Sequence, residues 1–561
     1  MISTRKAGSV FLRLGAGRLH VCLLTVLIAV HLGLLLASLS KTSVTSDEAS
    51  HLAIGYGYLD SGNSDWLLLN PPLQRSLAAI PLFFRSVNFD AASPGHPVDF
   101  WFRGLNFMNQ NRDRYHGLFM SGRAVVCILS GCTALLVYLL AAKIQDRRAG
   151  VIALFLYCLS PALLAHGGLV TTDLSAATAG VAMVTGVLHY RSRQTLPALV
   201  LAGFSFSLLF VSKFNALIFL PAGLLLLTFP PRHVGVEEIE EERPRHIART
   251  ALDIAAVLFI SWLVLCGFYL FQGVFLSPSN ITLSSPLLGR INSLPDWLRI
   301  PLPAAYIKAM DLQFSDVLGA HQSYLFGLRE PSFWYFPACL LFKASMPVLF
   351  LFVAGVVTRD SRRLIWAVFP AVFFLLFMSA VTDKQMGIRM ILPALPFMFV
   401  CGGCPAARLW EKGREKHKLL LRFLVLALLG WHAAYAIFAY PHYISAFNEL
   451  AGGPSLPHHG HRFLADSNLD WGQDWIRLKK WQEKNNVDNL SLAWFGIVDP
   501  AVYGVTYEPD DCRLKPGYLA VSANLVLGID PYRKQKCYTR LKKRGPIEKV
   551  GASVWVYRIN Q

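Results

Sequence analysis

Long apolar runs separated by short polar segments are the feature that most constrains this chain. Each run approaches the roughly 20 residues that a helix needs to cross a bilayer. Of the 561 residues, 54% are hydrophobic and only 16% are charged, which is too apolar for a set of soluble domains. The pattern predicts an α-helical polytopic membrane protein with about 11–13 transmembrane helices. The runs expected to span are 19–39, 122–142, 148–166, 173–190, 195–212, 214–229, 251–273, 332–357, 363–381, 387–404 and 419–440.

Lys and Arg cluster in alternate connecting segments, and this alternation predicts the orientation. Basic clusters occur before residue 19 and at 143–148, 190–194, 230–250, 358–363 and 407–418. If the N-terminus is cytoplasmic, all of these segments face the cytoplasm, as the positive-inside rule requires. The run at 19–39 exceeds the apolar region of a signal peptide, so we expect an uncleaved first span. Residues 41–121, 274–331, 382–389 and everything from 441 then lie outside.

The chain is expected to divide into a membrane domain, residues 1–440, and a small extracytoplasmic α+β domain, residues 441–561. Within the second, LSLAWFGI, GYLAVSA and ASVWVYRI have the pattern of short strands, and LDWGQDWIRLKKWQEKNN that of an amphipathic helix. Cys512 and Cys537 both fall in this polar region, and they can pair if the compartment is oxidising. The sequence leaves their pairing open.

The net charge of +18 does not indicate a nucleic-acid partner in this context. In a membrane protein, excess Lys and Arg mark loops that face anionic lipid, so the bilayer is the expected partner. Cys401 and Cys404 have CxxC spacing but end an apolar run, with no second ligand pair in reach. Zinc and redox chemistry are therefore not expected at that position.

The first outer segment begins with two adjacent carboxylates, Asp47 and Glu48, followed by His51 at helical spacing. Thr45 and Glu48 fit a capping box, and acids are ordinary in a first helical turn, so a purely structural role is one interpretation. The other interpretation is functional, because an acidic pair held against the outer face of a membrane protein is a costly placement.

Five further polar residues stand at the expected outer ends of different spans: Arg123, His166, Asp173, Lys213 and Arg389. Each has a structural alternative, since a cation can snorkel to lipid headgroups and an acid can cap a helix. Together with Asp47 they place acids and cations around one outer crevice. That combination suits the binding of a lipid-linked phosphate beside a nucleophile that is being activated.

Several motifs carry a family resemblance. SDEASHLAIGYGYLDSG followed by NPPL resembles the first-loop motif of GT-C glycosyltransferases, closest to the protein O-mannosyltransferase and lipid A aminoarabinose transferase group. LSPALLAHGGLVTTDLSAA is similar to the second acidic loop of that group, and LVSKFNALIFLPA, WYFPACLLFKASMPVLF and GIRMILPALPF are similar to its later motifs. FNELAGGP and DSNLDWGQDW resemble segments of bacterial family 39-like members. The chain differs where Asn70 stands in place of a common His, and where 274–331 is too short for MIR domains.

The resemblance implies transfer of a sugar, with inversion, from a polyprenyl-phosphate carrier to an acceptor hydroxyl or similar nucleophile. Asp47 would act as the catalytic base that accepts the proton of the acceptor. Arg123, Lys213 and Arg389 would bind the donor phosphate, whose negative charge grows in the transition state.

The remaining candidates, Glu48, His51, His166 and Asp173, would bind the acceptor or the sugar. A divalent cation held by Asp47 and Asp173 stays open, because two acids do not define a metal site. The acceptor, whether protein, lipid or glycan, also stays open.

Two other classes are compatible with a polytopic chain. A lipid or sugar transporter, or flippase, usually has ionisable groups near mid-membrane and internal repeats, and neither is evident here. A non-catalytic envelope scaffold would leave the outer acids and cations unexplained. The expected location is a bacterial plasma membrane, with the C-terminal domain outside.

Overall fold

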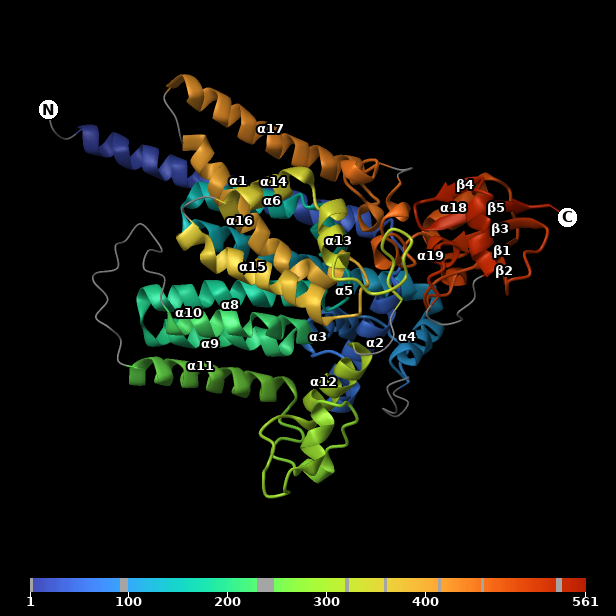
Figure 1. The fold of residues 1–561 in the computed structure, drawn as a ribbon, viewed down its shortest axis with the longest axis horizontal. Helices are drawn as coiled ribbons and strands as arrows, with labels where there is room; N and C mark the ends of the chain where they lie inside the picture. The colour runs from blue at the N-terminus through green and yellow to red at the C-terminus, as the bar shows by residue number, and fades with distance from the viewer. Residues whose placement is uncertain are drawn as a thin grey trace.

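The structure is a computed structural model that describes residues 4–90, 99–229, 247–317, 322–357, 361–411, 415–455, 459–530 and 537–560. Helices form a large body, and a small sheet lies at one end of it near the C-terminus (Figure 1). The cytoplasmic segment expected at 230–250 lies outside the described residues up to 246, as do parts of 358–363 and 407–418.

The helices follow one another from the N-terminus with short connections. They are α1 (Thr4–Leu39), α2 (Ser46–Ser61), α3 (Leu73–Ala79), α4 (Asp99–Gln110), α5 (Tyr115–Ile144), α6 (Arg147–Cys158), α7 (Pro161–His166), α8 (Asp173–Arg193), α9 (Leu196–Val211), α10 (Leu220–Thr228), α11 (Ile247–Phe268), α12 (Ala304–Val317), α13 (Tyr335–Lys343), α14 (Met346–Val357), α15 (Ser361–Val381), α16 (Leu395–Glu411), α17 (Glu415–Ala439), α18 (Trp475–Lys484) and α19 (Ala523–Leu527).

Within the described residues, six helical segments are long and apolar enough to cross a membrane. They are Arg18–Leu39, Arg112–Ile144, Ile247–Phe268, Leu364–Val381, Ile388–Glu411 and His417–Ala439. Helices α13 and α14 meet at a bend of 120° and add a seventh if they form one broken span. The predicted class, a helical polytopic membrane protein, is confirmed.

The number of spans differs from the expected 11–13, and the difference arises largely between residues 148 and 229. Helix α6 has 12 residues, α9 has 16, and the 214–229 run breaks into a 3₁₀ helix at Phe214–Phe219 followed by α10. Helix α8 has 21 residues, but it is rich in Ala, Gly, Ser and Thr and almost all of them are buried. A helix enclosed by other helices needs no apolar exterior, because its neighbours shield it from lipid.

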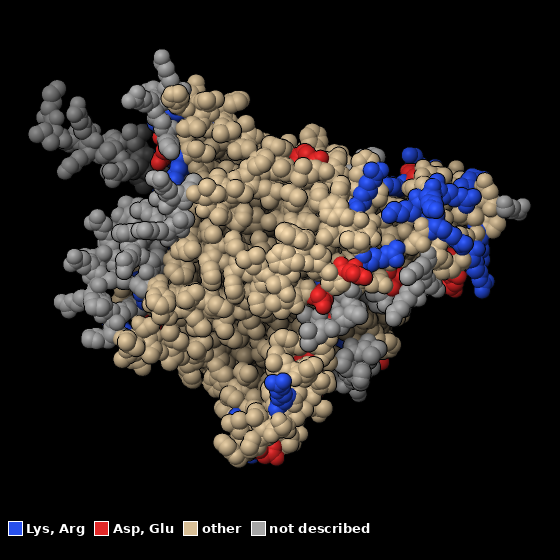
Figure 2. Space-filling view, in the orientation of Figure 1, with Lys and Arg blue, Asp and Glu red and all other residues tan. Residues whose placement is uncertain are grey.

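The surface of the helical body differs in charge from that of the C-terminal part. Figure 2 shows a broad face of the helical body almost without charged side chains, whereas Lys and Arg gather on the C-terminal part. Large apolar side chains are exposed on α1, α11 and α17, including Leu19, Phe259 and Phe423, each more than 60% exposed. Such exposure is expected where a helix faces lipid tails.

The C-terminal part is a five-stranded mixed sheet with two helices, which confirms the predicted small α+β unit. The strands are β1 (Leu490–Ala493), β2 (Tyr507–Pro509), β3 (Gly517–Ser522), β4 (Glu548–Val550) and β5 (Val554–Ile559), in the order β2-β1-β3-β5-β4. Strand β1 pairs parallel with β2 and β3, whereas β5 pairs antiparallel with β3 and β4. The last apolar helix, α17, ends at Ala439, which supports the domain boundary that we propose at residue 440.

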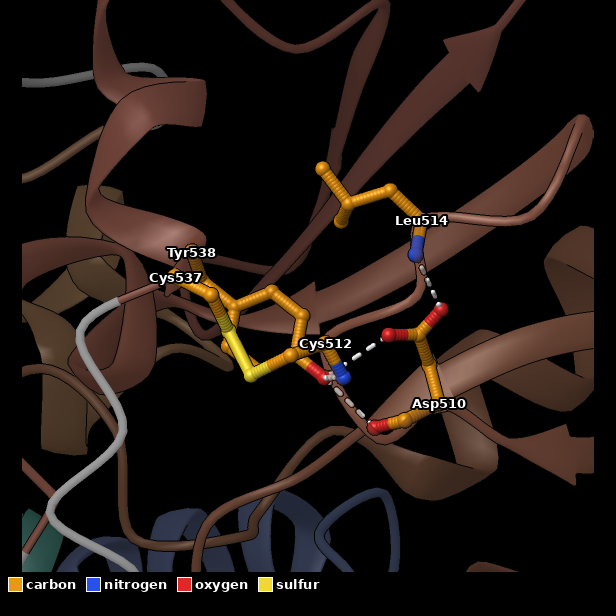
Figure 3. Close-up of a disulfide and its surroundings, with 5 residues drawn as sticks. All are labelled: Asp510, Cys512, Leu514, Cys537 and Tyr538. Atoms are coloured by element: carbon orange, nitrogen blue, oxygen red, sulfur yellow. Dashed lines mark hydrogen bonds between the residues drawn. A yellow bond between two sulfur atoms is a disulfide. The ribbon is translucent and has the colours of Figure 1, made fainter.

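Cys512 and Cys537 form a disulfide in this unit (Figure 3). The bridge joins the loop after β2 to the 3₁₀ helix Cys537–Lys543, and both cysteines pack against the hydrophobic core. The Tyr538 hydroxyl accepts a hydrogen bond from the Cys512 amide at 3.0 Å and donates to Asp510. The pairing that the sequence left open is therefore present.

The C-terminal part packs directly on the start of the outer loop. The backbone amides of Ser43 and Ser46 donate to the carbonyls of Gln473 and Trp471, each at 3.1 Å. The Ser43 hydroxyl donates to the Gly472 carbonyl at 2.9 Å. These bonds place residues 471–473 against the first turn of α2.

Candidate active site

Helix α2 begins and ends where its local sequence provides caps. The Thr45 amide donates to the Glu48 carboxylate at 2.9 Å, which is half of the expected capping box. The helix ends at Gly62, whose φ of 64° lies in the left-handed region that glycine adopts without strain. Asp47 and Glu48 both belong to the first turn, but only Glu48 takes part in the cap.

Glu48 is fully buried and forms an ion pair with Arg123 of α5. Arg123 Nη2 and Nε lie 2.6 Å and 2.9 Å from the two carboxylate oxygens, and neither side chain has any exposed surface. The Val170 amide donates to the same carboxylate at 3.0 Å. Burial alone would raise the pKa of Glu48, but the Arg123 charge and these hydrogen bonds outweigh it and lower the pKa.

The remaining donors of Arg123 are also used within the protein. They bond the carbonyls of Leu39, Thr42 and Ser43, at the end of α1 and the start of the outer loop. Neither Arg123 nor Glu48 lines the cavity described below. This placement corrects two expectations, because a buried and saturated pair cannot contact a donor phosphate or an acceptor. The pair instead fastens α1, α2 and α5 together.

A cavity of about 390 Å³ lies on the other side of the first turn of α2. Five of the residues singled out in the sequence line it: Asp47, His51, Asp173, Lys213 and Arg389. They come from α2, from the start of α8, from the segment before Phe214 and from the 3₁₀ helix Ile388–Ala394. The structure therefore brings together most of the expected outer polar residues.

The charged side chains of the cavity alternate in sign. Arg389 Nη1 lies 2.8 Å from the Asp47 carboxylate and 3.8 Å from that of Asp173. Lys213 Nζ lies 2.6 Å from the other oxygen of Asp173. The Asp173 side chain is 1% exposed whereas that of Asp47 is 19% exposed. Asp47 is thus the more accessible of the two acids, and Asp173 contacts both cations.

The cavity continues from this charged end between apolar side chains. They come from the region of α10 and from α15: Phe214, Leu217, Ile218, Pro221, Phe373, Phe377, Met378 and Val381. Phe377 and Val381 are 39% and 55% exposed, so this end is open at the apolar surface of the helical body. A charged pocket that continues into an apolar groove matches an amphiphile with a charged head.

Three residues that sequence reasoning did not assign also belong to the site. Lys384 lines the cavity and pairs with Asp316. Asn215 lines it with a buried amide oxygen that has no hydrogen-bond partner among the described residues. Trp471 lies behind the charged end, where its indole N–H donates to Asp47 at 3.4 Å and its ring lies 4.2 Å from the Arg389 guanidinium. Trp471 belongs to the motif DSNLDWGQDW, whose family resemblance was visible in the sequence, but the motif did not indicate which residues Trp471 contacts.

His166 occupies a different place from the one expected. It is 1% exposed, does not line the cavity, and packs its ring against Trp471 at 5.9 Å between centroids. Its position corrects the expected contact with acceptor or sugar. His51, in contrast, lines the cavity, and burial together with the charge of Arg75 lowers its pKa well below the usual value, so the ring is neutral.

The described residues contain no group of three or more His, Cys, Asp or Glu side chains that could hold a metal ion. Asp47 and Asp173, the two acids considered as ligands, each contact a cationic side chain instead. Cys401 and Cys404 are buried within α16 as free thiols.

Two family models match separate parts of the chain. Residues 116–266 match the model described as dolichyl-phosphate-mannose-protein mannosyltransferase, and residues 312–463 match the Alg9-like mannosyltransferase family. Together they cover the segments that contribute Arg123, Asp173, Lys213 and Arg389. No curated protein matches the chain.

Solved structures that align with most of this chain include membrane proteins bound to lipid phosphates. The archaeal oligosaccharyltransferase AglB from Archaeoglobus fulgidus, in complex with an inhibitory peptide and a dolichol-phosphate, aligns with a TM-score of 0.50 at 12% identity, covering 90% of this chain and 69% of that chain. ArnT from Cupriavidus metallidurans bound to undecaprenyl phosphate aligns with a TM-score of 0.48 at 12% identity, covering 95% and 97%.

The family models and the fold lead to one class of enzyme. Both models describe mannosyltransferases, and the first names a sugar donor linked to a lipid phosphate. The segments that the two models match belong to a polytopic helical body, and a small mixed sheet follows it at the C-terminus. The chain is a multi-pass membrane glycosyltransferase whose matched segments are similar to mannosyltransferases, one of them described by a sugar donor linked to a lipid phosphate.

Proposed function

We propose that this enzyme transfers a sugar from a polyprenyl-phosphate carrier to an acceptor hydroxyl at the outer face of the membrane, with Asp47 as the catalytic base. The observation that carries the proposal is the shape of the cavity, whose charged end continues into an apolar groove. A carrier of this kind has a phosphate head, which suits the charged end of the cavity, and a long apolar chain, which suits the apolar groove.

The phosphate of the donor would lie against Arg389 and Lys213, with Lys384 near the same wall. These cations project into a partly closed cavity, where a charge interacts more strongly than it does in water. They stabilise the phosphate in the bound donor and more strongly in the transition state, as the glycosidic bond to the phosphate lengthens.

Asp47 would take the proton of the acceptor hydroxyl as its oxygen attacks the anomeric carbon opposite the phosphate. The new bond joins acceptor oxygen to sugar, and the bond between sugar and phosphate breaks with its electron pair on the phosphate. The products are the glycosylated acceptor and polyprenyl phosphate, and the configuration at the anomeric carbon inverts. This role needs hydrogen-bond reach, which the partial exposure of Asp47 supports.

Two neutral groups in the cavity suit the hydroxyls of a sugar. His51 has a buried ring nitrogen, and Asn215 a buried amide oxygen, that lack partners among the described residues. A buried polar atom without a partner is costly, and a sugar hydroxyl would satisfy each of them. These two unpartnered polar atoms support a sugar site between the proposed phosphate-binding cations and Asp47. It is also a reason to keep His51 as a sugar-binding residue.

The outer location has a second line of support besides the basic cytoplasmic segments. The Cys512–Cys537 disulfide lies in the C-terminal part that packs on α2. Disulfides persist in oxidising compartments and are rare in the cytoplasm. We place the reaction at the outer face of a bacterial plasma membrane.

We favour glycosyl transfer over the transporter function that the sequence also allowed, because the matched families are transferases.

The decisive experiment combines purified enzyme in vesicles with undecaprenyl phosphate mannose and a panel of peptide, lipid and glycan acceptors. Release of undecaprenyl phosphate that depends on one acceptor is the expected result. Asp47→Asn should lower turnover at saturating substrates by about a hundredfold or more, since loss of a general base has that scale. Donor binding should not weaken, because the Asp47 carboxylate competes with the phosphate for Arg389, and thermal stability should change little. Asp47→Asn with more than about a third of wild-type turnover would refute the role of base.

A further inference from the structure

The charged end of the cavity is supported from behind by a segment of the C-terminal part, residues 466–473. Trp471 is 2% exposed and contacts both members of the Asp47–Arg389 pair. Its indole N–H donates to the Asp47 carboxylate at 3.4 Å, and its ring faces the Arg389 guanidinium at 4.2 Å. One aromatic side chain therefore restrains the proposed base and a proposed phosphate-binding cation.

A second residue of the segment holds the other side of Arg389. Arg389 Nε donates to the Ser467 hydroxyl at 3.2 Å, and that hydroxyl in turn donates to the Met386 carbonyl. Nearby, the Asn468 side-chain oxygen accepts from the Ile388 amide at 2.9 Å. Because Arg389 is held on two sides, its guanidinium is aimed into the cavity before any substrate arrives.

The position of Trp471 is itself determined by backbone contacts. Its carbonyl accepts from the Ser46 amide at 3.1 Å, and its amide donates to the Gln473 side chain at 2.7 Å. Ser46 directly precedes Asp47, so this hydrogen bond joins the loop that carries the indole to the helix that carries the proposed base.

We propose that Trp471 and Ser467 are positioning residues of the transferase, so that the C-terminal part completes the active site. This inference rests on the proposed function. The indole N–H orients the Asp47 carboxylate toward the acceptor, and the indole face with the Ser467 hydroxyl orients Arg389 toward the donor phosphate. Misplacement of either group by about 1 Å is enough to slow a reaction that depends on alignment.

The test separates the two contacts of Trp471. Trp471→Phe keeps an aromatic face for Arg389 but removes the N–H, so kcat should fall about tenfold while KM for undecaprenyl phosphate mannose stays within about twofold. Trp471→Leu removes both contacts, so KM for the donor should rise about tenfold in addition. Ser467→Ala should raise KM for the donor about threefold with little change in kcat.

Trp475→Phe is the matched control, since Trp475 begins α18 just after the segment. Trp475 is equally buried, and its indole N–H has no partner among the described residues. Its substitution should leave kcat and KM within about twofold, and thermal unfolding of every variant verifies the fold. Unchanged kcat and KM in both Trp471→Phe and Ser467→Ala would overturn the positioning role alone. A wild-type protein that binds undecaprenyl phosphate but transfers no sugar would overturn the proposed function and this inference with it.

Discussion

Adjacent residues of an α-helix point about 100° apart, and Asp47 and Glu48 therefore reach different surroundings. Glu48 faces Arg123 in the interior, and Asp47 faces the cavity. The sequence could identify the pair but not divide the two roles, because the division depends on where α5 places Arg123. The capping interpretation is confirmed for Glu48, and the functional interpretation stays a prediction for Asp47.

Removal of Glu48 tests this division. Glu48→Gln leaves Arg123 buried without its counter-charge, which costs about 3–5 kcal/mol in comparable buried pairs. We expect a clearly lower thermal midpoint in detergent, measured beside Asp47→Asn, which should unfold like the wild type. Normal stability combined with lost turnover in Glu48→Gln would return Glu48 to the substrate site.

Asp470 gives the C-terminal part a dependence on pH. Burial raises its pKa to about 7 against the opposing hydrogen bonds from Ser522 and Gly472. The folded state thus holds a proton that the unfolded chain has already released above about pH 4. Stability from this group is present below the unfolded pKa and is lost as the pH rises toward 7, at about 1.4 kcal/mol per unit.

Asp470→Asn should remove that dependence because the amide does not titrate. Wild-type protein is expected to unfold at a higher temperature at pH 5.5 than at pH 7.5, and the variant should show a smaller difference. Differential scanning fluorimetry at the two pH values checks the prediction. An equal shift in both proteins would assign the pH dependence to other groups.

At the level of elements, the long apolar helices were predictable because each faces lipid over most of its length. The helices between residues 148 and 190 were harder to predict. Helices α6, α7 and α8 are largely buried against other helices, so their sequences lack the pattern of lipid-facing spans. The groove between α10 and α15 could not be predicted, because neither helix shows in its sequence which neighbour it leaves uncovered. The α+β character of the C-terminal part was predictable from three short strand patterns.

The groove predicts a dependence on carrier length. Met378→Trp places a larger side chain in the apolar wall formed by α15. We expect a higher KM for the undecaprenyl donor, about tenfold, and little change for a donor with two isoprene units that does not extend along the groove. Leu376→Trp is the control, since Leu376 is 53% exposed on the same helix and does not line the cavity. Equal effects on both donor lengths would contradict a groove for the carrier.

At the level of the whole molecule, the site unites residues that are far apart in the chain. Asp47 and Trp471 are separated by 424 positions, and Asp47 and Arg389 by 342. The resemblance of ordered motifs was sufficient to nominate Asp47, Asp173, Lys213 and Arg389. It could not nominate the contact with Trp471, because that contact exists only once the C-terminal part has packed on the outer loop.

The orientation can be tested with two single cysteines in a background without the unpaired native cysteines. Thr195→Cys lies in the exposed connection between α8 and α9, and Ser293→Cys in the exposed outer segment before α12. A membrane-impermeant maleimide should label Ser293→Cys in intact cells and Thr195→Cys only after the membrane is opened. Labelling of both from the same side would contradict the topology.

The ion pair between Arg389 and Asp47 has a kinetic consequence. In the substrate-free enzyme the carboxylate that should receive a proton is engaged by the guanidinium that should receive a phosphate. A donor phosphate competes for that guanidinium and so releases the carboxylate. If Asp47 is the base, we expect the enzyme to activate an acceptor only after the carrier has bound, and initial-rate kinetics should show a compulsory order of addition with the lipid first.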